Sequence, residues 1–364
     1  MIRLIIAIII SWIIIGLFIK DDLKNNFEDL ALGTQTSTYF AKGENNDLIH
    51  LRELNNFDQL YNDWSKRGKN DIILLMGNSQ YHGINQMKPE NVNLSQILYN
   101  HFIKHRIDFI TNSLANVNLQ EQYLIFAYFA ELLPIKMLIL PVFMDDTRED
   151  NIRFGLPEYL SNNANYNQKN RIVDKLDNTE IQLNNDDLAG LKETFQEKVE
   201  FSINQLLNKY SLKWSKRPEL RGELFFRLYT LRNSLFGISP STKRRKIIGP
   251  YKDNMYAYEL ILQHCKSMRI NTLVYIPPIR NDLKIPYDSK EYIDFKNEVK
   301  NIAQFYNTNF VNLENIVPGE YWGLKASTNI DDDLEWDFMH FQYSGHKILA
   351  DTLLNHINNI LLFE

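Results

Sequence analysis

Five short apolar segments stand out in the polar sequence after residue 70. They lie at residues 72–76, 107–110, 137–143, 272–276 and 310–313. Each segment is mostly continuous in apolar character and is bounded by turn residues, which is typical of strands that are buried on both faces. The pattern therefore predicts five strands of a parallel sheet.

Amphipathic stretches alternate with these segments and predict helices. Apolar residues recur at helical spacing over residues 94–102, 119–132, 256–268 and 292–306, and again at the C-terminal end. Asn118 and Glu121 have the spacing of a capping pair at the start of the second helix. Alternating strands and helices indicate a doubly wound α/β/α sandwich, in which active sites gather at the carboxyl ends of the strands.

Residues 150–250 interrupt this alternation and predict an inserted helical subdomain. The stretch is rich in Asn, Lys and Arg, and its second half interleaves basic residues with Phe and Tyr. Such a mixture suits a surface that rests on anionic lipid headgroups or on a membrane partner. A helix with a buried apolar stripe and a solvated basic face is the structural alternative.

The amino terminus carries a further apolar run. Residues 4–19 are apolar apart from Ser11 and Gly16, and charge begins at Lys20. The run approaches the ~17 residues that a spanning helix needs, and no small-residue cleavage motif follows it. We therefore expect a single-pass transmembrane signal anchor at residues 1–20, with a cleaved secretory signal as the alternative.

The expected anchor sets the expected compartment and domain order. A short N-terminal tail ahead of a large body usually stays inside the cell, so the body would lie on the periplasmic or extracellular side of the cytoplasmic membrane. Residues 21–69 are polar and rich in Asn. They indicate a stalk and peripheral segment, followed by a main domain at residues 70–364.

The composition excludes several classes of protein. The chain has 364 residues, of which 44% are hydrophobic and 23% charged, so it can bury a full core. Its formal net charge of -5 argues against nucleic acid as a partner. The single cysteine, Cys265, cannot form an internal disulfide and belongs to no Cys/His cluster of zinc spacing. We therefore expect a buried thiol, no metal site and no cofactor.

Ser79 follows the first predicted strand. It ends the sequence G-N-S at residues 77–79, where the glycine permits a tight turn. This position exposes the hydroxyl at the carboxyl edge of the sheet, beside backbone N–H groups that can stabilise an oxyanion. A serine after a strand is also a common helix cap or loop residue, so the position alone leaves both roles open.

A second polar motif lies near the other end of the chain. Asp337 and His340 are three residues apart, just before the last predicted helix. In a turn, this spacing can bring the carboxylate to one ring nitrogen and fix the tautomer, so that the other nitrogen faces a serine as general base. Three other histidines fall in predicted helices, and we interpret them as structural: His101, His105 and His346.

In chain order these motifs resemble the SGNH/GDSL hydrolase superfamily. The first block of that superfamily carries the nucleophile as G-D-S or G-N-S, and its last block is D-x-x-H before the C-terminal helix. The matching residues are G-N-S at 77–79 and D-F-M-H at 337–340. The resemblance implies a three-layer α/β/α sandwich with a parallel flavodoxin-like sheet. It also implies that Ser79 is the nucleophile, His340 the base and Asp337 the residue that orients it.

The two middle blocks of the superfamily match less well. They supply a glycine after the second strand and an asparagine after the third, which complete the oxyanion hole. Asn116 lies near the first of these positions and Asp146 near the second. An ionised aspartate cannot donate a hydrogen bond, so Asn116 and the backbone N–H of Ser79 are our candidate oxyanion donors. We expect Asp146 and Arg148 to form an ion pair that shapes the pocket or binds substrate.

The expected anchor narrows the resemblance to one branch. Membrane-tethered proteins with such middle blocks resemble the partners of membrane-bound O-acyltransferases, which add acetyl or D-alanyl groups to alginate, teichoic acid or other envelope polymers. That resemblance implies that Ser79 takes an acyl group from a membrane-bound O-acyltransferase and passes it to a hydroxyl group of an envelope polysaccharide or teichoic acid. A membrane-anchored carbohydrate esterase or deacetylase would use water instead. A non-catalytic accessory protein with an SGNH fold is the third hypothesis.

Overall fold

The computed structural model describes residues 40–85, 88, 90–149, 152–153, 156, 242–326 and 334–361. The expected anchor at 1–20 lies outside them, as does nearly all of the expected helical insertion. No helix within the described ranges is long and apolar enough to cross a membrane.

Two compact units divide the chain. The larger unit contains Ser37–Leu183, Pro240–Leu324 and Trp336–Glu364. The smaller one overlaps the described residues only at 325–326 and 334–335. The fold described below is that of the larger unit.

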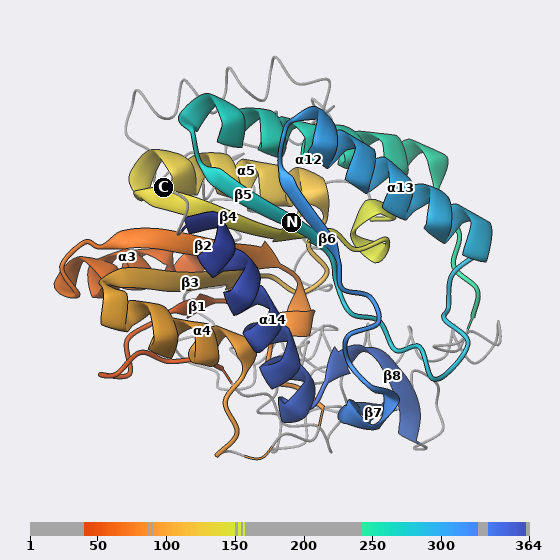
Figure 1. Ribbon diagram of the computed structural model, residues 1–364, viewed down its shortest axis with the longest axis horizontal. Helices are drawn as coiled ribbons and strands as arrows, with labels where there is room; N and C mark the ends of the chain where they lie inside the picture. Colours follow the sequence, from red (N-terminus) through yellow and green to blue (C-terminus); the bar gives the residue numbers. More distant parts are fainter. Residues whose placement is uncertain are drawn as a thin grey trace, which may run out of the picture. The chain divides into compact units, whose positions relative to one another are not determined.

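A six-stranded parallel sheet forms the centre of this unit (Figure 1). Its strand order is β1-β3-β2-β4-β5-β6, and every neighbouring pair is parallel. The strands are β1 (His50–Leu51), β2 (Asp71–Gly77), β3 (Ile107–Ser113), β4 (Ile135–Pro141), β5 (Asn271–Ile276) and β6 (Asn309–Asn312). The five strands that the apolar segments predict are all confirmed as parallel members of one sheet.

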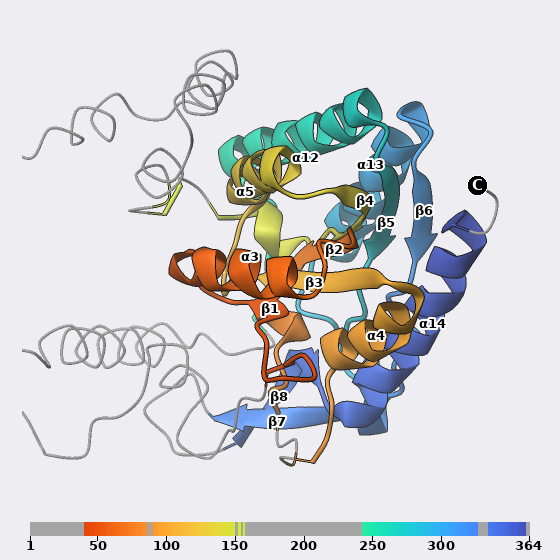
Figure 2. The ribbon, with the colours of Figure 1, turned by 90° about the vertical axis from the view of Figure 1, so that its left-hand side faces the viewer.

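Helices cover both faces of the sheet, as Figure 2 shows. One face packs against α3 (Phe57–Lys66), α5 (Leu119–Leu132), α12 (Ile248–Met268) and α13 (Ser289–Phe305). The other face packs against α4 (Leu94–Phe102) and α14 (Tyr343–Leu361). Successive residues of β2 alternate between the two cores, because neighbouring side chains of a strand point to opposite faces. Leu74 lies in the first core, and Ile73 and Leu75 lie in the second. The predicted three-layer α/β/α sandwich is thus confirmed.

The segment before residue 70 adds to this sandwich. We expected only a stalk and peripheral structure there, but β1 pairs with β3 at the edge of the sheet, and α3 buries Phe57, Leu60 and Trp64 in the first core. The strand escaped prediction because it has two residues, one of them His50. A run that short gives no periodic signal.

Local capping explains where the helices begin. The Asn118 side chain accepts the Glu121 N–H, and the Glu121 carboxylate accepts the Asn118 N–H, which confirms the expected capping box of α5. Asn93 caps α4 in a similar way. Cys265 lies in α12 and is buried, as predicted, and burial raises the pKa of its thiol to about 12.

The strand order changes direction at β2. From β2 the chain continues to β3 on one side, and it then crosses to β4 on the other side of β2. In open parallel sheets, ligands bind outside the carboxyl ends of the strands at such a switch point. The short turns η2 (Ser79–Tyr81) and η4 (Asp145–Thr147) follow β2 and β4.

A separate two-stranded sheet precedes the last helix. It consists of β7 (Trp322–Ala326) and β8 (Leu334–Phe341). We expected Asp337 and His340 in a turn just before the last helix, and the structure places both within strand β8, which ends at Phe341. The remaining short turns are η1 (Leu54–Asn56), η3 (Ile103–His105) and η5 (Gly319–Tyr321).

Candidate functional site

The turn that carries Ser79 is fixed by close packing and by its own cap. A Cβ atom on Gly77 would lie 2.4 Å from Cε2 of Tyr81 and 3.1 Å from Cγ of Pro141, so only glycine fits at this point. The Asn78 side chain accepts the backbone N–H of Gln80 at 3.0 Å. Asn78 and Gln80 are buried, whereas Ser79 between them is partly exposed. The hydroxyl group is therefore presented at the carboxyl end of β2.

The structure brings Ser79, His340 and Asp337 together across 261 positions of sequence. Ser79 Oγ lies 3.1 Å from Nε2 of His340. On the other side of the ring, Nδ1 of His340 lies 2.9 Å from Oδ2 of Asp337. These distances are those of a nucleophile, a base and a base-orienting carboxylate in hydrogen-bond contact.

Asp337 is held in place by its own turn. Its Oδ1 accepts the backbone N–H groups of Met339 at 2.9 Å and His340 at 3.0 Å, while its side chain is only 2% exposed. An aspartate that binds the backbone two and three residues on forms a rigid local turn. The carboxylate therefore holds the backbone and the imidazole of His340 at the same time.

Two buried amides that no sequence motif predicts join the Ser79 turn to the His340 strand. Gln80 Nε2 donates to the carbonyl oxygens of Pro278 at 2.9 Å and Met339 at 2.8 Å. Asn85 Nδ2 donates to the carbonyl oxygen of His340 at 2.7 Å. Since a buried carbonyl is costly to leave unpaired, these bonds favour one position of His340 relative to Ser79.

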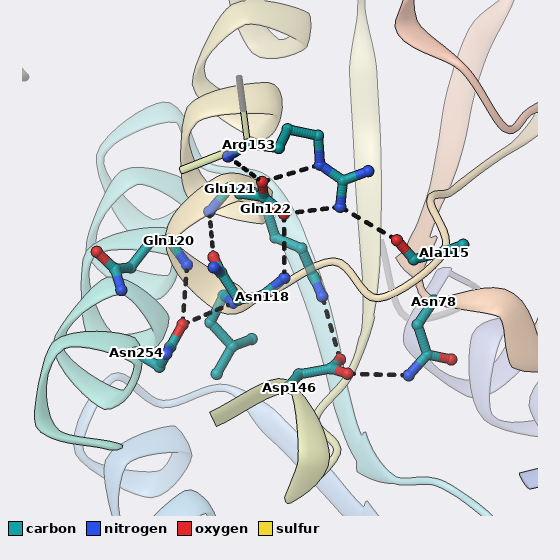
Figure 3. A network of polar contacts seen from close by, with 10 residues as sticks. Asn78, Ala115, Asn118, Gln120, Glu121, Gln122, Asp146, Arg153 and Asn254 are labelled. Carbon is teal, nitrogen blue, oxygen red and sulfur yellow. Dashed lines mark hydrogen bonds and ion pairs between the residues drawn. The ribbon is translucent and has the colours of Figure 1, made fainter. Parts of the chain in front are cut away.

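Asp146 contacts Asn78, the residue before Ser79 (Figure 3). Its Oδ1 accepts Nδ2 of Asn78 at 3.0 Å, and its Oδ2 accepts Nε2 of Gln122 at 3.4 Å. The residue is 4% exposed. Burial raises the pKa of this carboxyl well above its ordinary value, and the nearby charges of Asp145 and Glu149 raise it further. Asp146 thus supports the residue that precedes Ser79.

The expected ion pair between Asp146 and Arg148 is wrong. Arg148 pairs with Asp145 at 3.4 Å and donates to the carbonyl oxygen of Arg245 at 2.9 Å. Asp145 also binds Arg244 and accepts the hydroxyl of Tyr287. Residues three apart on a helical turn share a face, whereas residues two apart do not. The 3-10 turn η4 therefore directs Arg148 to Asp145.

Asn116 lies in the loop after β3. Its side chain is exposed, and its φ of 51° lies in the left-handed region. Glycine favours that region, and asparagine tolerates it better than most other residues. Within the described ranges no hydrogen bond joins Asn116 to the three residues of the Ser79 site. The position suits a residue standing in for glycine, as the resemblance implies.

An ion pair with one buried partner restrains the same loop, as Figure 3 shows. Arg153 contacts both oxygens of Glu121 at 2.8 Å and donates to the carbonyl oxygen of Ala115 at 3.2 Å. The Glu121 carboxylate is 3% exposed. A bidentate contact of this kind combines charge with fixed geometry, so it restrains the backbone next to Asn116.

Two other histidines near the sheet, His346 and His50, are buried. His346 accepts the N–H of Leu94 through Nδ1 at 3.4 Å, and burial lowers its pKa to about 3. His50 lies 2.6 Å from Oγ of Ser113, and burial also lowers its pKa well below the ordinary value. Both side chains are therefore neutral at physiological pH. Among the described residues, no group of three or more His, Cys, Asp or Glu side chains is placed to hold a metal ion.

We expect Asp146→Asn to flatten the pH dependence of stability. The folded-state pKa of Asp146 is raised, so the unfolded chain loses this proton first, and stability falls as pH rises from the ordinary carboxyl range toward the folded-state pKa. One such proton changes the free energy of unfolding by at most about 1.4 kcal/mol per pH unit. The introduced amide cannot titrate, and it still accepts Nδ2 of Asn78. Thermal unfolding between pH 4 and pH 8, followed by circular dichroism, measures the difference.

Asp253→Asn is the matched control for this experiment, because Asp253 is exposed on α12. It should leave the slope of Tm against pH as it is in the unmodified protein. Equal slopes for Asp146→Asn and the unmodified protein would show that Asp146 titrates in its ordinary range.

Comparison with known proteins gives distant structural matches only. No protein-family profile and no curated protein sequence matches the chain. An acetylxylan esterase from Geobacillus stearothermophilus is 10% identical, with a TM-score of 0.39 over 80% of this chain and 96% of that one. The psychrotrophic esterase EstA from Pseudoalteromonas sp. is 10% identical, with a TM-score of 0.37 over 80% of this chain and 98% of that one. At this distance, activity has to be judged from the chain's own side chains.

Proposed function

We propose that the protein is a serine-dependent acyl-transfer enzyme that cleaves an ester of a carbohydrate hydroxyl group. The continuous hydrogen-bonded chain from Ser79 Oγ through His340 to Asp337 carries this proposal. It lies at the carboxyl edge of a parallel sheet, where such folds bind ligands. The named esterases among the structural matches act on esters, which agrees with this reaction class.

The first half-reaction forms an acyl-enzyme. Ser79 Oγ attacks the carbonyl carbon of the ester while Nε2 of His340 takes the hydroxyl proton. The bond from the carbonyl carbon to the alkoxy oxygen then breaks, and His340 returns the proton to the leaving oxygen as the sugar hydroxyl departs. Asp337 keeps Nδ1 protonated, so that Nε2 faces the serine as an acceptor.

Two backbone N–H groups are our candidates for stabilising the oxyanion. Ser79 is the first residue of η2, and the first N–H groups of a helical turn have no partner within it. The N–H of Asn116 is the second candidate, because Asn116 adopts the left-handed conformation at the position of the superfamily's glycine. Donors aimed at the developing charge are often the largest contribution to catalysis.

The second half-reaction decides between an esterase and a transferase. Water, deprotonated by His340, would release the acyl group as a carboxylic acid. A polysaccharide or teichoic acid hydroxyl, deprotonated in the same way, would receive the group as a new ester. The apolar run at residues 4–19 favours the transferase, because it would hold the enzyme beside a membrane-bound O-acyltransferase that supplies the acyl group.

A trapped intermediate tests the shared step. Brief reaction with p-nitrophenyl acetate, followed by acid quench and mass spectrometry, should add one acetyl group to the peptide that contains Ser79. Acetylation at another serine, or release of p-nitrophenol with no adduct under any quench time, would contradict the proposal. Adding an oligosaccharide acceptor then separates the two enzymes, since a transferase yields acetylated sugar and an esterase yields acetate.

A further inference from the structure

We propose that Trp336 is the platform on which a sugar ring of the substrate stacks; the inference rests on the proposed acyl chemistry at Ser79. Trp336 is 52% exposed, an unusual state for so large an aromatic side chain. It directly precedes Asp337 in β8. The ring is therefore attached one residue away from the carboxylate that orients His340.

Arg280 fixes the ring from behind. Its guanidinium carbon lies 4.4 Å from the centre of the Trp336 ring, while Arg280 itself is only 4% exposed. A cation over the face of an indole attracts it, and the attraction grows when the cation is removed from water. Arg280 thus covers one face of the Trp336 ring. The exposed half of the side-chain surface lies on the remaining part of the ring.

The guanidinium is itself held by protein groups. It contacts both oxygens of Asp282 at 2.9 and 3.1 Å and donates to the carbonyl oxygen of Gly323 at 3.0 Å. The backbone N–H of Arg280 also donates to the carbonyl oxygen of Phe338 at 3.4 Å, beside the triad. Arg280 is therefore fully engaged and acts as a rigid support, so little side-chain freedom remains to be lost when a ligand stacks on Trp336.

The chemistry of the site points to a sugar. The C–H face of a pyranose ring is apolar and slightly positive, and it complements the negative face of an aromatic ring. Both carboxylate oxygens of Asp282 accept from Arg280, so Asp282 supports the ring indirectly, through the guanidinium. Stacking of this kind favours a ring with an apolar face, and the proposed acyl chemistry at Ser79 makes that ring the sugar that carries the ester. It offers little to a small ester that lacks a ring.

Kinetics with two esters test the platform on the full chain. The ratio of kcat/KM for a partially O-acetylated xylo-oligosaccharide to kcat/KM for ethyl acetate, an ester with no ring, should fall about tenfold in Trp336→Ala, mainly through KM, because an aromatic contact of about 1.4 kcal/mol corresponds to a factor of ten. Trp336→Phe keeps a stacking face and should recover most of the ratio. Phe305→Ala removes an aromatic side chain that is 76% exposed on α13 and is the matched control.

Each outcome decides the inference. An unchanged ratio of kcat/KM values in Trp336→Ala, or an equal loss with both esters, would overturn the platform while leaving the triad in place. The ratio would also stay unchanged if Trp336 contacted a protein partner and no sugar. A loss that Trp336→Phe does not recover would also overturn it. If the unmodified protein cleaves neither ester, the proposed function has failed, and isothermal titration with unacetylated xylo-oligosaccharide then tests the platform alone. Binding that Trp336→Ala weakens about tenfold supports it, and no binding rejects it.

Discussion

Ser79→Ala is expected to lower kcat for ester cleavage by a thousandfold or more, on the order of the loss seen when a triad nucleophile is removed. The physical reason is that Oγ supplies the electron pair that forms the acyl-enzyme, and no described side chain takes its place beside Nε2 of His340. Steady-state rates with p-nitrophenyl acetate measure the effect. The Tm should change little, because Ser79 is partly exposed and alanine fits the same turn.

Ser267→Ala provides the comparison. Ser267 is exposed on α12 and donates to a carbonyl oxygen of its own helix, so its loss should affect neither rate nor Tm. Equal activity of Ser79→Ala and the unmodified protein would refute the nucleophile assignment. A large fall in Tm for Ser79→Ala would instead show that the serine is a structural residue of the turn.

The central sheet was predictable from sequence because its strands are buried on both faces. The run that forms β2 is apolar at successive positions, because its side chains pack alternately into the two cores. The two-residue β1 and the two-stranded β7–β8 sheet escaped prediction for the opposite reason. Leu334 and Trp336 in β8 are exposed, so the strand has no continuous apolar run.

The contacts among Ser79, His340 and Asp337 were predictable because each residue lies in a short local motif. Ser79 follows a strand, and Asp337 and His340 are three residues apart, so sequence spacing alone places two of the three residues within reach of each other. The amide contacts of Gln80 were not predictable. They reach backbone carbonyls that are 198 and 259 positions away, and any carbonyl can accept an amide whatever its side chain.

Asp146 shows how a correct position can carry a wrong contact. The sequence placed it near the site, and the structure agrees, but its partner is Asn78 rather than Arg148. An ion pair at this position would bury an ionised carboxylate, which is costly. In the structure the carboxyl group of Asp146 accepts from the amides of Asn78 and Gln122, and its pKa is raised.

Asp337→Asn should remove almost as much activity as losing the serine. Oδ1 of the new side chain can still accept the N–H groups of Met339 and His340, so the turn persists. The amide nitrogen would then face Nδ1 of His340 and donate to it. Nε2 of His340 must then carry the proton, so it donates toward Ser79. An imidazole in this tautomer cannot accept the proton of the Ser79 hydroxyl group. In serine proteases the same change lowers kcat about 10⁴-fold.

If Asp337 acts by fixing the tautomer of His340, a double substitution gives a sharper test than loss of activity alone. If Asp337 acts only by setting the protonation of His340, Ser79→Ala combined with Asp337→Asn should be no worse than Ser79→Ala alone, since residues of one triad are not additive. Asp351→Asn, an exposed change on α14, should leave kcat at the unmodified value. Activity of Asp337→Asn within tenfold of the unmodified protein would mean that His340 keeps its base form without the carboxylate. The buried contact at 2.9 Å would then serve only to hold the turn.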